Sequence, residues 1–132
     1  MIELDYAFLA DYAAIQESKL TAVGASFTRM VVREMPSQVM LSVAGRVRVS
    51  TDIDEVNLAI RATAPHQSYQ LDGTLRISDL KNLPEYGEGK RGAVFALQFS
   101  LPLMEFGTYV IEVDILETEG VDRVLKFEAV SL

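Results

Sequence analysis

The chain has 132 residues, of which 49% are hydrophobic and 23% charged, with no cysteine and a formal net charge of -7. This length and composition predict one globular domain with a core of its own, and the missing cysteine excludes disulfides and thiolate metal sites. The acidic balance argues against binding to nucleic acid or anionic membranes, both of which need clustered Lys and Arg. Acidic residues stand at the start, where a secretion signal needs basic ones, and no apolar run reaches the roughly 18 residues of a membrane span. We therefore expect synthesis and residence in the cytoplasm.

The first 32 residues are predicted to form two strands. Apolar and polar side chains alternate over residues 2–15, which favours a strand, although the same stretch would also make an acceptable helix. Residues 16–19 are a polar turn, and residues 20–32 return as the second strand. Gly24 lies inside that strand and indicates a bulge or a close approach of two backbones.

Three strands with clean alternation are expected next, separated by turn-forming residues at 50–54 and 65–68. One apolar side and one polar side on each strand is typical of antiparallel sheets. The residues expected to point inward are Val39, Leu41, Val43, Val47 and Val49, then Val56, Leu58, Ile60 and Ala62, then Tyr69, Leu71, Leu75 and Ile77.

The stretch Ala93–Leu116 is predicted to be a buried β-hairpin and the largest contributor to the core. Ser78–Gly92, the long connection before it, is rich in glycine and charge, and such loops are usually functional or mobile. A last strand follows the turn at 118–120. The inward residues of the hairpin are Ala93, Phe95, Leu97, Phe99, Leu101, Tyr109, Ile111, Val113 and Ile115, and those of the last strand are Val121, Leu125, Phe127 and Ala129.

Together these elements predict an all-β fold. About eight strands with no credible helix are typical of an antiparallel two-sheet β-sandwich, immunoglobulin-like or C2-like, and we expect residues 1–132 to form it as a single domain.

Two motifs resemble known proteins. The opening AFLADYA (7–13), then KL (19–20) and VGASF (23–27), resembles a family of small, uncharacterised actinobacterial and phage-associated proteins. That family has LAD-x-A, GKL and Gly-Gly-x-aromatic, and Ser18 and Ala25 stand here where it usually has glycine. FGTYVIEV (106–113) is similar to the start of a late strand in immunoglobulin-like and C2-like sandwiches. The resemblance implies a fold and a phage association but no catalytic residue, because the family has no assigned activity.

His66 is the only histidine, so every catalytic arrangement that needs a histidine base depends on it. It lies in Ala-Pro-His-Gln-Ser between two predicted strands, and we expect a solvated loop histidine.

Asp52, Asp54 and Glu55 place three acids on one loop, an arrangement with which C2-type sandwiches bind calcium. Calcium needs six to eight oxygen ligands and no second acidic loop of matching spacing is obvious, so a charged turn is the preferred interpretation.

Glu112 and Asp114 are two acids on the polar face of one strand, about 7 Å apart by the strand rise. A carboxyl pair could serve acid and base chemistry, but perturbed pKa values require burial or close like charges. We therefore expect an exposed face, and no enzyme activity is predicted.

The outward positions of the sheet suggest an interaction surface. Either the charged residues pair across strands within one sheet, with a few tenths of a kcal/mol each, or the sandwich has a basic and an acidic side that favours docking of identical copies. The outward basic residues are Arg46, Arg48, Arg61 and Arg76, and the outward acidic ones are Glu112, Asp114, Asp122 and Glu128. Lys90 and Arg91 in the long connection complete the candidate interaction residues.

We expect a non-enzymatic structural or interaction protein without a cofactor, which docks on copies of itself or on a larger protein shell. The phage association makes a virion component, such as a capsid decoration protein, its most concrete form. The alternative is a host-side bacterial module that binds a ligand or calcium through the loops at residues 78–92 and 52–55.

Overall fold

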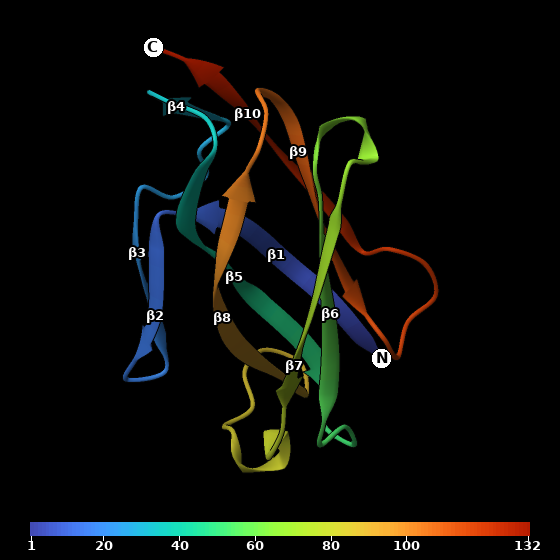
Figure 1. Ribbon diagram of the computed structural model, residues 1–132. Helices are drawn as coiled ribbons and strands as arrows, with labels where there is room; N and C mark the ends of the chain where they lie inside the picture. The colour runs from blue at the N-terminus through green and yellow to red at the C-terminus, as the bar shows by residue number, and fades with distance from the viewer.

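The first of two large sheets has three antiparallel strands. In the computed structural model, which describes residues 1–132, they are β1 (Ile2–Ala10), β5 (Ser37–Ser50) and β8 (Lys90–Leu103), in the order β1-β5-β8 (Figure 1). β5 and β8 pair along their whole lengths, while β1 carries a register shift between Leu4 and Tyr6. A shift of one residue exchanges the two faces of a strand. Both halves of β1 can therefore turn apolar side chains inward.

The second sheet has five strands. They are β4 (Arg29–Val32), β10 (Arg123–Ser131), β9 (Gly107–Ile115), β6 (Val56–Thr63) and β7 (Gln70–Ile77), in the order β4-β10-β9-β6-β7. β4 is parallel to β10, and all other pairs are antiparallel. β7 and β4 are therefore the edges of this sheet, as β1 and β8 are the edges of the first.

A separate hairpin, β2 (Tyr12–Gln16) and β3 (Lys19–Val23), contacts β5 and β8 of the first sheet. Its contact with the sheet is made of small side chains, which allow close approach: Ala10, Ala13 and Ala44 form a cluster of their own. The chain also has two short 3₁₀ turns, η1 (Pro65–Gln67) and η2 (Leu80–Asn82). No helix in the structure has the length and apolar character to cross a membrane.

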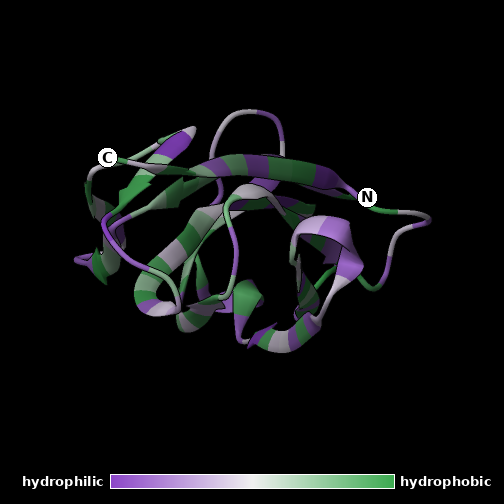
Figure 2. Cartoon of the chain, turned by 45° about the horizontal axis from the view of Figure 1, so that its top comes forward, coloured by the Kyte–Doolittle hydropathy of each residue, from purple (hydrophilic) through white to green (hydrophobic).

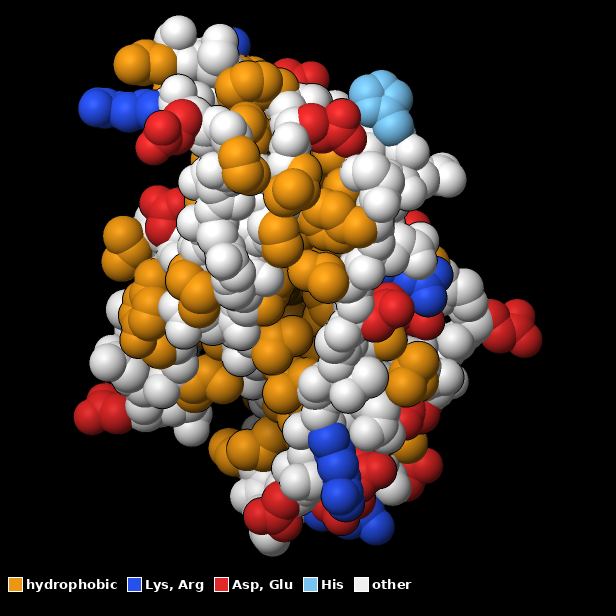
Figure 3. All heavy atoms as spheres, in the orientation of Figure 1, with side chains coloured by type: hydrophobic (Ala, Val, Ile, Leu, Met, Phe, Trp, Pro, Cys, Tyr) orange, Lys and Arg blue, Asp and Glu red, His pale blue; other side chains and the backbone are white.

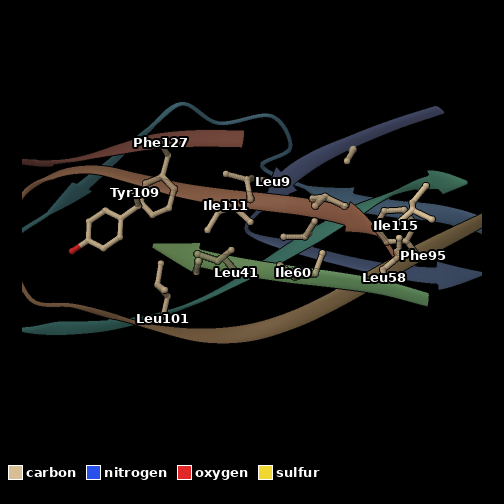
Figure 4. Close-up of a cluster of buried hydrophobic side chains, with 14 of the residues drawn as sticks. Leu9, Leu41, Leu58, Ile60, Phe95, Leu101, Tyr109, Ile111, Ile115 and Phe127 are labelled. Carbon is tan, nitrogen blue, oxygen red and sulfur yellow. The ribbon is translucent and has the colours of Figure 1, made fainter. Parts of the chain in front are cut away.

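The core lies between the two large sheets and draws on both of them. Hydropathy alternates along the strands (Figure 2), and strands such as β6 and β9 bury every second side chain against the facing sheet. Tyr109 and Phe127 stack with ring centroids 5.2 Å apart, and Phe27 meets Phe127 edge to face at 5.5 Å. Figure 4 shows the largest members of this cluster converging from the two layers: Leu9, Leu41, Leu58, Ile60, Phe95, Leu101, Tyr109, Ile111, Ile115 and Phe127.

The all-β prediction is confirmed, and so is the strand interpretation of residues 2–15, which form β1 and β2. The single strand predicted at 20–32 is wrong. It divides into β3 and β4, because Gly24 and Ser26 adopt positive φ angles of 63° and turn the chain. The structure has ten strands where about eight were expected.

The predicted hairpin at Ala93–Leu116 is also wrong, although its inward residues are correct. β8 pairs only with β5 and β9 only with β6 and β10, so the two strands face each other from different sheets. The chain crosses between the sheets at residues 104–106. The Tyr109 hydroxyl donates a hydrogen bond to the Glu105 carbonyl at 2.7 Å, the contact that a tyrosine corner makes, and this fastens the crossing.

Two predicted inward residues lie at the surface. Val121 is 49% exposed because it precedes β10 instead of belonging to it, and Leu71 is 39% exposed because β7 is an edge strand. The exposure of Leu71 leads to the site described next.

Candidate functional site

The two sheets leave one side of the molecule open between β7 and β8. Each of these strands pairs on one side only, β7 with β6 and β8 with β5, so both turn an unpaired backbone edge toward the gap. In Figure 3, hydrophobic side chains form a stripe down the middle of this face, in the region between β8 and β7 of Figure 1. We call this gap the β7–β8 groove.

Two hollows lie along the β7–β8 groove. One has a volume of about 240 Å³ and is lined by Leu71 and Gly73 of β7 and by Leu97 and Phe99 of β8, with Ile60 and Ala62 at its floor. The second, of about 210 Å³, lies where Ile77 ends β7 and Ala93 begins the apolar part of β8. Both are lined mainly by apolar side chains.

Gly73 is the reason for the first hollow. A Cβ atom at this position would lie 3.8 Å from Leu97 Cδ2, an ordinary contact distance, and the backbone at Gly73 does not need a positive φ. A side chain would therefore fit here. Its absence leaves Leu97 and Phe99 only partly buried at the open side of the core.

Hydrogen bonds hold the chain at both ends of the β7–β8 groove. At one end the Tyr69 hydroxyl, just before β7, donates a hydrogen bond to the carbonyl of Pro102 in β8. Burial raises the pKa of Tyr69 to about 12, which keeps this hydroxyl protonated as a donor. At the other end Arg91 donates to the carbonyls of Leu83 and Thr51, at 2.9 and 2.7 Å. The Tyr69 bond joins the two walls of the groove, and the Arg91 bonds attach the start of β8 to neighbouring loops.

Arg91, predicted as an interaction residue of the long connection, lies at the start of β8 with its side chain against neighbouring loops. Its side chain is only 14% exposed because those two carbonyls hold it against the chain. Lys90 is half-buried, begins β8, and accepts a hydrogen bond at its carbonyl from the amide of Tyr86. Within Ser78–Gly92, Leu80 is fully buried, so part of this connection belongs to the core.

Arg46 and Arg48 pair with acids of β1 on the outer face of the first sheet. Arg46 Nε donates to Asp5 Oδ2 at 2.8 Å, and Arg48 bonds to Glu3. The hydrogen bond from Arg46 lowers the pKa of the Asp5 carboxyl, and the charges of both arginines lower it further, against the opposing effect of burial. The guanidinium of Arg46 also lies 5.2 Å from the ring centroid of Tyr6.

The two arginines of the second sheet also pair with acids, Arg61 across to β7 and Arg76 with the loop that precedes β6. Arg61 Nε donates to Asp72 Oδ1 at 2.8 Å, and Arg76 Nε donates to Glu55 Oε1 at 2.6 Å. The four arginines therefore pair locally, with acids other than the predicted Glu112, Asp114, Asp122 and Glu128. None of the four offers an unpaired positive charge.

The outer face of β9 holds a carboxyl pair that the sequence did not predict in this form. Asp114, expected to be exposed, has one carboxyl oxygen that is buried and has no hydrogen-bond partner. Burial raises the pKa of Asp114, and the hydrogen bond and charge of Asp122 and the charge of Glu112 raise it further. Asp122 accepts from the Ile115 amide at 2.7 Å and so holds the turn before β10. Asp114 and Asp122 are therefore better explained as part of that turn than as a catalytic site.

The acidic loop does not gather its carboxylates. Asp52 accepts from the Ser50 hydroxyl at 2.6 Å, Asp54 accepts from the Lys81 amide at 3.0 Å, and Glu55 takes the Arg76 guanidinium. No group of three potential metal ligands converges anywhere in the chain. The carboxylates of this loop therefore do not converge on a common point, as a calcium site would require.

His66 occupies the turn between β6 and β7, with φ at 58° and an 84% exposed side chain. Its Nδ1 lies 3.4 Å from Glu105 Oε2. This agrees with the predicted solvated loop histidine.

Sequence reasoning missed the β7–β8 groove. A signal was present, since Gly73 interrupts an alternating strand and leaves no side chain to pack at that position. The pattern could not show that β7 and β8 would each lack a neighbour on the same side.

A protein-family model matches residues 5–127, and its description is a family of unknown function. No curated protein matches the chain. The match extends over nearly the whole sequence, and it agrees with the expected membership of an uncharacterised family.

Proposed function

This chain belongs to the family of unknown function DUF6941, and we propose that it is a non-enzymatic structural or interaction protein whose docking site is the β7–β8 groove. One observation carries the proposal: a stripe of partly exposed apolar side chains lies between two unpaired strand edges. Contiguous apolar surface of this kind on soluble proteins marks interaction sites.

The proposal also names the form of the bound segment. Unpaired N–H and C=O groups on β7 or β8 can form a ladder with an added strand, and alternate side chains of that strand can enter the groove. β7 spans eight residues, so a partner segment of similar length covers both hollows.

The charged side chains singled out in the sequence support docking rather than chemistry. Arg46, Arg48 and Arg61 each bind an acid on a neighbouring strand, Arg76 binds an acid of the loop before β6, and Arg91 binds two loops. The groove itself is lined mainly by apolar residues.

Photo-crosslinking in cells of the natural source tests the proposal. The crosslinking residue replaces Leu71 in the wall of the groove, and a matched control replaces Val124, which is 48% exposed on β10 in the same sheet. We expect a discrete adduct, identified by mass spectrometry, from position 71 and none from position 124.

Gly73→Leu in the same background should abolish the adduct, because the added side chain fills the hollow beside Leu97. No adduct from position 71, or the same adducts from both positions, would contradict a docking site in the groove.

The narrower proposal, a virion component such as a capsid decoration protein, rests on the sequence resemblance. Mass spectrometry of purified particles from the natural source tests it, and we expect the chain among the particle proteins. The immunoglobulin-like or C2-like assignment of the two facing sheets likewise stays a prediction.

A further inference from the structure

β7 is the least protected of the four edges of the two large sheets. Proteins block free edges with short strands, bulges, prolines and charges, because an open edge pairs with other strands. β4 has only four residues, β1 has a bulge, and β8 contains Pro102. β7 pairs with β6 through eight residues without a register shift and contains no proline, and its two charges, Asp72 and Arg76, are of opposite sign.

We propose that two copies of this chain associate through β7, which pairs with β7 of the second copy in antiparallel orientation, centred on Thr74. This inference rests on the proposed function and names its partner. Such an interface is isologous, so each contact occurs twice. It joins the five-stranded sheets of the two copies into one continuous sheet.

Charge complementarity supports the second copy as the occupant. In the register centred on Thr74, Asp72 lies opposite Arg76 of the second copy, and Arg76 lies opposite its Asp72. Both side chains are on the outer face, and although each pairs within its own chain, with Arg61 and Glu55, they are 61% and 69% exposed and accessible to a further partner. The two copies of Thr74 meet at the centre, and Thr–Thr and opposite-charge pairs stabilise neighbouring strands.

The inward face is complementary in size in the same register. Leu71 lies opposite Ile77 of the second copy, and Gly73 lies opposite its Leu75. The hollow of about 240 Å³ beside Gly73 thus stands where the large side chain of the second copy arrives. Leu71, at 39% exposure in the single copy, becomes covered.

Other registers of the two β7 strands do not match both the charges and the side-chain sizes. Centring the pair on Gly73 puts Arg76 opposite Gln70 and Asp72 opposite Thr74, so no charges meet. Centring it between two residues sets inward side chains against outward ones. Only the register around Thr74 satisfies both faces.

Charge reversal provides the test, read by sedimentation velocity and native mass spectrometry on the purified full chain. We expect the wild type to be a dimer. Asp72→Arg and Arg76→Asp each place like charges opposite one another, and each should raise the dissociation constant roughly tenfold or more. Mixing the two variants brings two positive side chains against two negative ones, and the mixture should form a heterodimer.

Lys126→Asp serves as the matched control, since it reverses one exposed charge on β10, an interior strand away from β7, and should remain dimeric. Thermal melting of each variant checks that it folds, as the ion pairs removed are exposed and contribute little to stability.

A wild type that stays monomeric at its highest soluble concentration overturns the inference. So does a dimer that both single variants leave intact, or a mixture that does not reassociate. If position 71 crosslinks to a different protein while the purified chain is monomeric, the groove remains the docking site and only the second copy is excluded. Absence of both results removes the two proposals together.

Discussion

At Gly45 the backbones of β1 and β5 approach so closely that a side chain has no room. A Cβ there would lie 2.1 Å from the Tyr6 carbonyl oxygen and 2.9 Å from both Ala7 Cα and Phe95 Cζ. We expect Gly45→Ala to lower the free energy of unfolding by about 3 kcal/mol, the upper end for overpacking, because two of the three obstacles are backbone atoms. Urea denaturation measures this. Gly73→Ala is the control and should change stability little, since its Cβ has 3.8 Å of space. Equal stability of the two variants would contradict the prediction.

Asp114 is a residue whose charge opposes folding. Its raised pKa means that the folded chain holds the proton more tightly than the unfolded chain. Its stabilising contribution is therefore present below its ordinary pKa and is lost as the pH rises through the raised value. Asp114→Asn removes the charge, and we expect it to be more stable than the wild type by about 1 kcal/mol at neutral pH, with the difference vanishing in acid.

Thermal melts of both proteins from acid to neutral pH check this, with Glu128→Gln as a control for losing an exposed carboxylate on the neighbouring strand β10. A stability difference for Asp114→Asn that is the same at every pH would show that the titration of Asp114 is not its cause.

At the scale of the element, the crossing from β8 to β9 is held by the hydroxyl of Tyr109. Tyr109→Phe keeps the stacking on Phe127 and removes the hydrogen bond to the Glu105 carbonyl. We expect a loss of about 1 kcal/mol in unfolding free energy, measured by urea denaturation. Tyr12→Phe alters an exposed tyrosine of β2 and should have no measurable effect. Equal effects of the two substitutions would show that the Tyr109 hydroxyl does not stabilise the crossing.

At the scale of the whole molecule, association and stability are linked. If only the folded chain pairs through β7, mass action makes the melting temperature rise with protein concentration. We expect this rise for the wild type and for Lys126→Asp, and a much smaller one for Asp72→Arg. Differential scanning calorimetry over a concentration series measures it. If the melting temperature of Asp72→Arg rose with protein concentration as steeply as that of the wild type, any association would involve a surface other than β7.

The sequence alone determined which side chains point inward. The pleat of a strand turns every second residue to the same face, so the pattern from Val56 to Ala62 needs no knowledge of other strands. It also indicated that outward arginines such as Arg46 and Arg61 pair with acids across strands.

Only the tertiary structure decided which strands are neighbours. Backbone ladders between distant segments form through the same N–H and C=O groups in any strand, so alternation cannot distinguish a hairpin from a crossing. For that reason β8 and β9 were wrongly paired, the partners Asp5 and Asp72 were not foreseen, and the β7–β8 groove was missed. The groove exists because β7 and β8 end their sheets on the same side, a property of the assembled layers and not of either strand.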